Sequence, residues 1–296
     1  MSQDQSEMKT LRLLFPQWQG GYDESEFPGQ IYPLGARLLA WLAPKSEAPF
    51  VEIPVEAWTG AEAPKEGGVF YRQEILRQMR AARNIIDAHA PDRVLTFGGD
   101  CLISQAPFAY LNERYDGKLG IIWIDAHPDV TTPKDFDHAH AMVLGNLLGD
   151  GEPLMAGEVK KPCKPEQVAL VGVDGVFPHE REAMDRFGLR VIPSKDIMNG
   201  GDAAAAWIRE KGFARVAIHL DLDVLDPTIF RSLLFANPHV GEHIESEHGK
   251  TRMHDIGRVL KDIAAQVDVV GMSFAEYMPW DALSLKKMLS ELSFMK

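Results

Sequence analysis

Two apolar segments that each end in a cluster of aspartates constrain this chain more than any other feature. Residues 119–124 read LGIIWI and lead into DAHPD at 125–129, while residues 215–220 read RVAIHL and lead into DLDVLDP at 221–227. Short apolar runs rich in β-branched residues are typical of buried strands. In an open parallel sheet, ligands collect at the carboxyl ends of the strands, which is where both acidic clusters would lie.

The acidic clusters predict a site for a divalent metal ion. Alternation along an extended chain places Asp125, His127 and Asp129 on one side, and likewise Asp221 and Asp223. Carboxylates gathered in a small volume repel one another unless cations lie between them. Oxygen ligands with one or two nitrogens suit manganese, with zinc, iron or cobalt as alternatives. The competing interpretation is that these acids cap helices or solvate loop ends, as single aspartates usually do.

Strand-like and helix-like segments alternate along the chain, which predicts an α/β fold with a parallel sheet covered on both faces. Helical spacing of apolar residues is clearest over 71–89 and again over about 253–267. No linker rich in Gly, Ser or Pro divides the chain, so we expect one domain over residues 1–296. The expected strands are 11–15, 50–55, 93–97, 119–125, 168–173, 189–192, 215–221 and 269–274.

Composition excludes several functional classes. The net charge is -12 and no basic stripe is present, which argues against nucleic-acid binding. The two cysteines form no disulfide framework, and this favours a reducing cytosol. The acidic start resembles no signal peptide, and no apolar run is long enough to span a bilayer. We therefore expect a cytoplasmic enzyme without a nucleic-acid or membrane partner.

Four motifs in order resemble the arginase, agmatinase and formimidoylglutamase group, the ureohydrolases, over about residues 90–280. They are GGDC at 98–101, DAHPD at 125–129, DLDVLDP at 221–227 and EYMP at 276–279. The resemblance implies a three-layer arginase-like fold with a central parallel sheet of about eight strands. It also implies a homo-oligomer, a trimer or hexamer. The expected reaction is hydrolysis of a C–N bond in a guanidino or related linear amidine, such as arginine, agmatine or a guanidino acid, to urea and an amine.

The resemblance also implies the metal ligands. Relatives hold a pair of manganese ions, and by motif matching Asp125 and Asp221 would bridge them. Asp129 would serve one ion, and His127 with Asp223 would serve the other.

Motif matching implies catalytic residues as well. Glu276 would hold the guanidinium group, and His140 within HAHAM at 138–142 resembles the family's proton-shuttling histidine. By chemistry alone His138 is an equal candidate for that shuttle. Asp129 or His140 could protonate the leaving amine.

One departure from the family pattern concerns the first metal ligand. Relatives with two ions usually carry a histidine where this chain has Cys101. A thiolate is softer than imidazole and prefers zinc to manganese, so the first ion could be weaker, exchanged or absent. The other interpretation of Cys101 is a small buried residue at the start of a helix. Two further functions stay open: a single-metal deacetylase-like amidohydrolase, and a metal-poor homologue that binds a ligand without turnover.

Substrate recognition is expected to differ from that of arginases. Segment 228–238 lacks the Pro-Gly-rich stretch that relatives often have, so the pocket wall should differ. The loops that would hold the far end of the substrate are acidic, which favours a cationic or neutral tail over a free α-carboxylate. The side chains in those loops are Thr131, Thr132, Asp135, Asp137, Asp174 and Glu180, of which Glu180 is our candidate for binding substrate.

The remaining histidines receive structural interpretations. His219 lies in phase with Asp221, so it is either a partner behind the ligands or a core residue, and we prefer the core. The polar segment around residues 239–248 is interpreted as a mobile loop near the pocket mouth rather than a second metal cluster. Its histidines and glutamates are His239, Glu242, His243, Glu245, Glu247 and His248.

Overall fold

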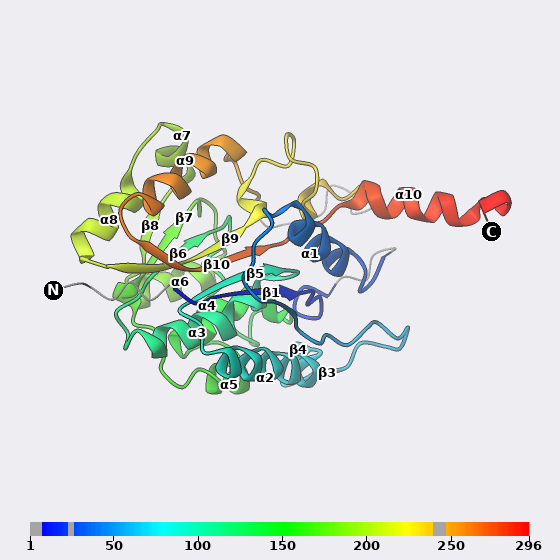
Figure 1. The fold of residues 1–296 in the computed structure, drawn as a ribbon, viewed down its shortest axis with the longest axis horizontal. Helices are drawn as coiled ribbons and strands as arrows, with labels where there is room; N and C mark the ends of the chain where they lie inside the picture. The colour runs from blue at the N-terminus through cyan, green and yellow to red at the C-terminus, as the bar shows by residue number, and fades with distance from the viewer. Residues whose placement is uncertain (1–7, 23–26, 239–246, 296) are drawn as a thin grey trace.

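The computed structural model describes residues 8–22, 27–238 and 247–295. Its centre is a sheet of eight strands in the order β2-β1-β5-β10-β9-β6-β7-β8 (Figure 1). Every neighbouring pair in this sheet is parallel, as predicted. The strands are β1 (Thr10–Phe15), β2 (Phe50–Glu52), β5 (Arg93–Gly98), β6 (Gly120–Ile124), β7 (Val168–Val171), β8 (Arg190–Ile192), β9 (Arg215–Asp221) and β10 (Asp268–Ala275).

All eight expected strands are confirmed, with ends that shift by at most three residues. The sequence did not indicate the short antiparallel pair of β3 (Lys65–Glu66) and β4 (Val69–Phe70). This pair is only two residues long on each side, too short to show an alternating pattern.

Helices cover both faces of the sheet, as predicted. Figure 1 shows α7, α8 and α9 on one side and α2, α3 and α5 on the other. The two helices expected from spacing are confirmed as α2 and α9. The helices are α1 (Ile31–Leu42), α2 (Arg72–His89), α3 (Gln105–Arg114), α4 (Val143–Leu148), α5 (Pro153–Gly157), α6 (Pro178–Phe187), α7 (Ser194–Met198), α8 (Ala203–Lys211), α9 (Met253–Ala264) and α10 (Trp280–Glu291).

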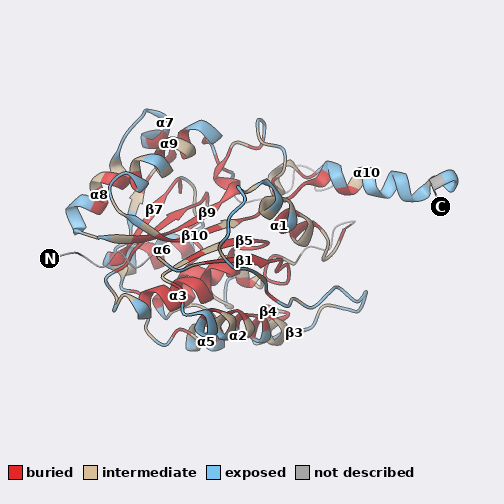
Figure 2. Ribbon diagram, viewed as in Figure 1, coloured by how far each residue is buried: buried red, intermediate tan, exposed pale blue. Residues whose placement is uncertain are grey.

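Strand β6 shows how the sequence builds two cores. All five of its residues are buried, because a central parallel strand is covered on both faces. Ile121 and Trp123 join the core that contains α2 and α3, whereas Ile122 and Ile124 join the core that contains α8 and α9. Figure 2 shows this buried layer along the strands, and it shows α10 extending away from it with mostly exposed residues. Within the described part of the chain, we find no helix with the length and apolar character needed to cross a membrane.

The order of the strands brings the four sequence motifs together. The motifs follow β5, β6, β9 and β10, and these four strands are consecutive neighbours in the sheet. Their carboxyl ends therefore meet at one edge. Gly99 permits this approach, because a Cβ atom there would lie 1.7 Å from the backbone oxygen of Gln17.

Candidate metal centre

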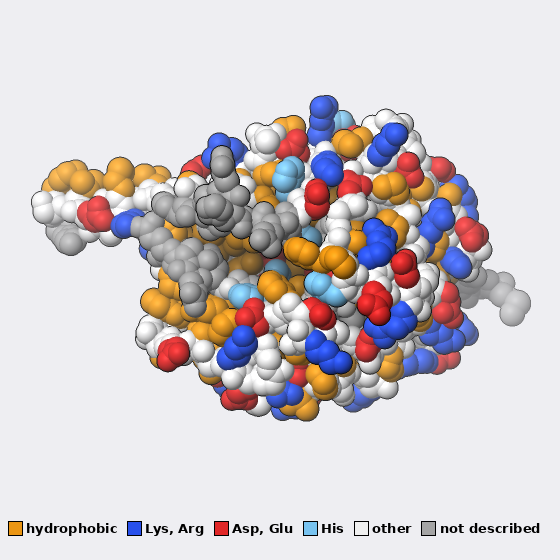
Figure 3. All heavy atoms as spheres, turned by 180° about the vertical axis from the view of Figure 1, so that it is seen from behind, with side chains coloured by type: hydrophobic (Ala, Val, Ile, Leu, Met, Phe, Trp, Pro, Cys, Tyr) orange, Lys and Arg blue, Asp and Glu red, His pale blue; other side chains and the backbone are white. Residues whose placement is uncertain are grey.

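A pocket of about 480 Å³ opens at the carboxyl ends of these strands. Figure 3 shows the corresponding face, with histidine and hydrophobic side chains gathered around a hollow. The pocket contains most of the predicted site residues together with a set of aromatic side chains. Its lining is Cys101, His127, Asp129, Thr131, Asp135, Phe136, His140, Ala141, Phe177, His179, Glu180, Asp221, Asp223, Leu234, Phe235 and Glu276.

Asp125, His127 and Asp223 form one group that could hold a metal ion. Nδ1 of His127 lies 3.0 Å from Oδ2 of Asp223 and 3.6 Å from Oδ1 of Asp125. The other ring nitrogen, Nε2, lies 3.0 Å from the backbone oxygen of Glu247. Histidines that bind metals usually donate their second ring N–H to a carbonyl or carboxylate in this way. The D-x-H-x-D and D-x-D motifs thus converge as the sequence predicted.

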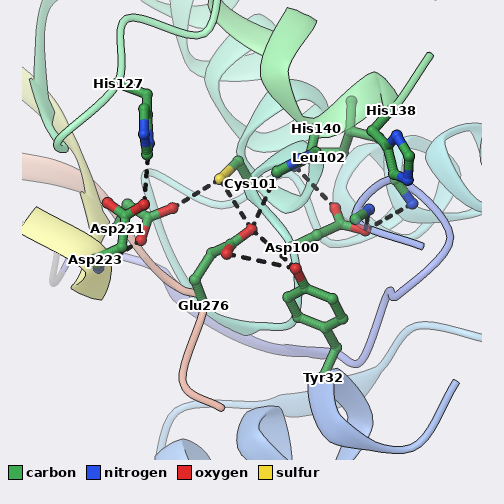
Figure 4. Close-up of polar contacts among 12 residues, drawn as sticks. Tyr32, Asp100, Cys101, Leu102, His127, His138, His140, Asp221, Asp223 and Glu276 are labelled. Atoms are coloured by element: carbon green, nitrogen blue, oxygen red, sulfur yellow. Dashed lines mark hydrogen bonds and ion pairs between the residues drawn. The ribbon is translucent and has the colours of Figure 1, made fainter. Parts of the chain in front are cut away.

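Cys101 begins a short 3-10 helix, η1 (Cys101–Ser104), and is buried. Its thiol donates to Oδ2 of Asp221 at 2.8 Å, and its sulfur lies 3.5 Å from Oε1 of Glu276. Figure 4 shows the sulfur between these two carboxylates. Both interpretations of Cys101 hold geometrically, since it is a buried residue at a helix start and also faces the acids.

A second group with metal-ligand geometry consists of Cys101, Asp125, His219 and Asp221, with ligand atoms all within 4.8 Å of one another. Asp125 is the residue that this group shares with the group of His127 and Asp223. His219 is fully buried, as expected of a core residue, but it also lies among the acids. A third group joins Cys101 to His140 and Glu276. Asp129 lines the same pocket but is in none of these three groups.

Asp129 and Glu276 both adopt left-handed backbone conformations, with φ of 50° and 60°. A positive φ is uncommon outside glycine, and it costs roughly 1–3 kcal/mol when the residue is not suited to it. Such conformations cluster at active sites, where the surrounding structure holds a side chain in a required direction. The backbone N–H of Glu276 donates to Gly99, which links the loop after β10 to the loop after β5.

The structure distinguishes the two histidines of the HAHAM segment. His140 lines the pocket, and its Nδ1 lies 3.2 Å from Oε1 of Glu276. His138 does not line it, because both of its ring nitrogens contact other groups, Asp137 at 2.6 Å and the backbone oxygen of Tyr22 at 2.7 Å. The expectation that favoured His140 therefore agrees with its position (Figure 4).

The buried carboxylates of Asp125, Asp129, Asp221 and Asp223, here called the pocket floor, have no lysine or arginine beside them among the residues that line the pocket. Burial, followed by repulsion from neighbouring carboxylates, raises the pKa of Asp129 and of Asp221 well above its usual value. Burial also raises the pKa of Asp223. Burial alone would raise the pKa of Asp125 too, but the nearby imidazoles of His127 and His219, each 3.6 Å away, hold it below its usual value. Oδ2 of Asp129 is buried without a hydrogen-bond partner.

Other predicted residues lie in different surroundings. Thr131, Asp135 and Glu180 line the pocket, and Glu180 also accepts a hydrogen bond from the backbone of Phe177 at the start of α6. Asp137 instead pairs with Lys65, and Asp174 accepts hydrogen bonds from Ser194. Neither Thr132, Asp137 nor Asp174 lines the pocket. The interpretation of segment 239–248 as a mobile loop falls mostly on residues 239–246, which lie outside the described residues.

Sequence reasoning missed most of the aromatic wall. Phe136 and Phe177 line the pocket although each is more than a third exposed. Phe235 stacks on His127 with ring centroids 5.9 Å apart, and Leu234 lies beside it. Of these residues, only Leu234 and Phe235 fall in segment 228–238, where a different pocket wall was expected. For Phe136 and Phe177, the available sequence signal is an aromatic residue within a loop segment.

Comparison with solved structures supports the predicted fold. The arginase from Bacillus caldovelox has a TM-score of 0.71 at 21% identity, covering 92% of this chain and 91% of that one. An Entamoeba histolytica arginase solved with L-ornithine has a TM-score of 0.70 at 19% identity, with the same coverages. The proclavaminate amidino hydrolase of Streptomyces clavuligerus has a TM-score of 0.63 at 17% identity, covering 92% and 84%. The three-layer arginase-like architecture expected from the motifs is confirmed.

Sequence comparison identifies the family. The arginase from Bacillus caldovelox is 32% identical over 143 residues, which is 45% of this chain and 47% of the relative. An arginase from Staphylococcus aureus is 27% identical over 140 residues, or 45% and 46%. The aligned part of the chain thus spans about half the length of the curated relatives it matches. The model of the family described as "Arginase family" matches residues 50–280, most of the chain. The chain therefore belongs to the arginase family.

Proposed function

We propose that this chain is a metal-dependent hydrolase that cleaves a C–N bond of a guanidino substrate and releases urea and an amine. The observation that carries the proposal is the pocket floor, where buried carboxylates converge from neighbouring strand ends without a lysine or arginine among the lining residues. An opposite charge from outside the chain would favour the ionised form of these carboxylates beyond what the neighbouring histidines do. A divalent cation and a guanidinium group would both supply it.

The residues present fit a divalent ion. Asp125, His127 and Asp223 offer oxygen and nitrogen atoms within reach of one ion, and the backbone of Glu247 orients the imidazole. The unpartnered Oδ2 of Asp129 gives a further oxygen ligand nearby. The family resemblance implies Asp125 and Asp221 as shared ligands of two ions, and of these two residues only Asp125 belongs to more than one ligand group of this structure. Manganese is the expected metal of the oxygen-rich part.

Each catalytic side chain then has a distinct task. When bound, a divalent ion would supply a water molecule that loses a proton near neutral pH. Glu276 accepts hydrogen bonds from the guanidinium group and fixes its plane beside the ligands. His140, 3.2 Å from Glu276, exchanges a proton with solvent and delivers one to the leaving amine, as could Asp129.

His140 is suited to that transfer by its surroundings. Burial alone would lower the pKa of His140, but the hydrogen bond to Glu276 raises it above the usual value. The hydrogen bond to Glu276 thus favours the protonated imidazole, which is the form that can give a proton to the amine.

The pocket mouth favours a substrate with an amine or neutral tail. Asp135 and Glu180 line the pocket with Phe136, Phe177 and Phe235, and neither Lys nor Arg is among the lining residues. An α-carboxylate would meet acids without a cation to pair with, whereas a methylene chain ending in an amine would pack on the aromatic rings. We therefore expect agmatine-like substrates to be preferred over arginine, with Glu180 at the far end.

The test combines metal analysis with urea release. Purified protein loaded with manganese or zinc would be supplied in parallel with arginine, agmatine, guanidinobutyrate, guanidinopropionate and an acetylated diamine. We expect bound metal, and urea from agmatine at a higher kcat/KM than from arginine. Turnover of the acetylated diamine without urea would favour the deacetylase-like alternative. A metal-loaded protein that hydrolyses none of these substrates would contradict catalysis.

We propose three further properties in line with the family resemblance: a single domain, a cytoplasmic location and a homo-oligomer, trimeric or hexameric. Helix α10 supports self-association, because it exposes Leu285, Met288 and Leu289. Exposed apolar patches of this kind often mark interaction surfaces. Light scattering of the full chain tests this point, and a monomeric mass at micromolar concentration would contradict it.

A further inference from the structure

We propose that Cys101, Asp125, His219 and Asp221 form a distinct inner metal site, which prefers a soft ion such as zinc or cobalt(II) to manganese. Asp125, His127 and Asp223 are here called the outer site. The inner site rests on the proposed metal dependence, but it assigns His219 as a ligand and makes the two sites chemically unlike. The preference follows from the donor set, because thiolate and imidazole select zinc-like ions and carboxylates suit manganese.

The backbone directs His219 toward the other inner ligands. His219 and Asp221 are two residues apart on β9, so their side chains leave the same face of the sheet. On the neighbouring strand β6, Trp123 is the register partner of His219. Asp125 follows Trp123 by two residues, just as Asp221 follows His219. Cys101 reaches the group from η1 and donates its thiol to Asp221. The four ligand atoms, all within 4.8 Å of one another, are close to what one ion requires, since Zn–N and Zn–S bonds of about 2.1 and 2.3 Å place two ligands up to about 4.4 Å apart.

The ring of His219 is held in a fixed orientation. It stacks on the indole of Trp123 with centroids 3.7 Å apart and an interplanar angle of 10°. Its Nδ1 lies 2.7 Å from the hydroxyl oxygen of Ser104, which belongs to the same short helix as Cys101. Metal-binding histidines are commonly oriented by such a contact on the nitrogen that does not bind the ion. The contact with Ser104 thus leaves Nε2 directed at the acids.

Nε2 of His219 is the observation that points to a ligand. The residue is fully buried, and this nitrogen makes no hydrogen bond; Oδ2 of Asp125 is 3.6 Å away, beyond hydrogen-bond distance. Buried polar atoms are nearly always satisfied, and leaving one unpaired costs about 1–3 kcal/mol. A core histidine selected only for packing would be expected to satisfy both nitrogens. A metal ion between Nε2 and the carboxylates would satisfy this one.

The inner and outer sites differ in access as well as in ligands. Cys101, His219 and Asp221 are each at most 2% exposed, whereas the outer His127 side chain is 22% exposed. Because its ligands are more buried, the inner site should exchange its ion more slowly than the outer site, and binding there should release the thiol proton.

Cobalt(II) spectroscopy of the full chain tests the ligands without reference to turnover. The metal-free protein would be titrated with cobalt(II) as wild type and as Cys101→Ser and His219→Gln. We expect a thiolate-to-cobalt charge-transfer band in wild type and in Asp223→Ala, which changes only the outer site. The band should be absent in Cys101→Ser. His219→Gln should weaken inner-site binding by at least about 10-fold and alter the visible bands.

Matched controls use side chains outside the two sites. Cys163→Ser removes the other buried cysteine, and His138→Gln removes a histidine that contacts Asp137. Both should keep the wild-type spectrum and affinity. A wild-type titration without the charge-transfer band would overturn the role of Cys101, and a His219→Gln protein that matches His138→Gln would overturn that of His219.

Zinc X-ray absorption of the wild type provides a measurement that does not depend on folding of the variants. With one equivalent of zinc we expect one sulfur at about 2.3 Å together with imidazole and oxygen. A shell of oxygen and nitrogen without sulfur would contradict the inner site. This outcome can be separated from that of the proposed function. The expected spectra without urea release would support the inner site and refute the hydrolase. Urea release with an oxygen-only shell would support the hydrolase and refute the inner site.

Discussion

Two sets of acids in this protein show opposite electrostatics. In the pocket floor, burial and like charges raise the pKa values of Asp129 and Asp221. Between α2 and α3, a bidentate ion pair with Arg83 lowers the pKa of Glu113, even though burial opposes this. Both sets lie within one compact chain of net charge -12. The difference is that Glu113 is paired with an arginine, whereas neither arginine nor lysine is among the residues that line the pocket.

This contrast separates residues that hold the scaffold from residues that hold a ligand. A scaffold acid such as Glu113 contributes to folding as soon as the helices pack. The pocket acids oppose folding until a cation arrives, which is the usual conflict between a functional site and stability. Mutations in the two regions should therefore change the stability of the metal-free protein in opposite directions. Their effects on activity should differ as well.

The largest expected effect comes from Asp221→Asn. This change removes a ligand of the inner site and one charge from the pocket floor, so hydrolysis of a guanidino substrate should fall by about 10³-fold or more. The same change relieves repulsion, so the metal-free melting temperature should rise by about 2–4 °C if roughly 1 kcal/mol is recovered. Urea release and thermal melting with a chelator measure the two effects. An active variant, or one whose metal-free form melts lower than wild type, would contradict the assignment.

Glu276→Gln should produce the next largest effect. Glu276 faces the pocket beside Cys101 and His140, and its positive φ of 60° fixes its direction. Loss of its charge should lower kcat/KM for agmatine or arginine by about 10²-fold, because the guanidinium then donates to a neutral amide instead of a carboxylate. Metal content, measured by elemental analysis, should be the same as in the wild type. Equal loss of metal and activity would mean that Glu276 is a ligand rather than a substrate contact.

Much of the pocket floor could be predicted from the sequence. The apolar run of β6 and the DAHPD motif behind it place Asp125 and His127 at a strand end by local rules alone. The strand order β5-β10-β9-β6 is a tertiary property that local rules do not give. The family resemblance nevertheless implied that the motifs after these strands meet in one site.

The inner site could not be predicted because it depends on distance in space. His219 occupies a position in β9 that alternation alone assigns equally to a core or to a partner of Asp221. Its role becomes visible only when Ser104 and Trp123 are seen to orient the ring. The aromatic wall escaped for the same reason, since Phe136 and Phe177 lie in loops whose paths no periodicity fixes.

The pH dependence of stability should differ with and without metal. A carboxyl group whose folded pKa is raised contributes stability that is fully present below its unfolded pKa and lost as pH rises through the folded value. For Asp129, Asp221 and Asp223, that loss begins above the ordinary value of 3.8. The metal-free protein should therefore melt at a lower temperature as pH rises from about 5 to 8. Saturating manganese or zinc should reverse this trend, because metal competes with protons for the same oxygens. Identical pH profiles with chelator and with metal would show that these carboxylates hold no ion.

The smallest expected effect is that of Glu113→Gln, which probes the scaffold side of the comparison. The carboxylate of Glu113 accepts two hydrogen bonds from Arg83, at 2.7 and 2.6 Å, in a partly buried position. Its loss should lower the free energy of unfolding by about 1 kcal/mol while metal content and urea release stay unchanged. Because the folded pKa of Glu113 is lowered, this contribution is present above the ordinary pKa of 4.5 and lost as pH falls through the folded value. Denaturant unfolding at pH 7 and at about pH 4 should show the difference between wild type and variant shrinking toward the acid side. A difference that instead grows in acid would place Glu113 with the pocket acids, since its folded state would then be the one that binds the proton more tightly.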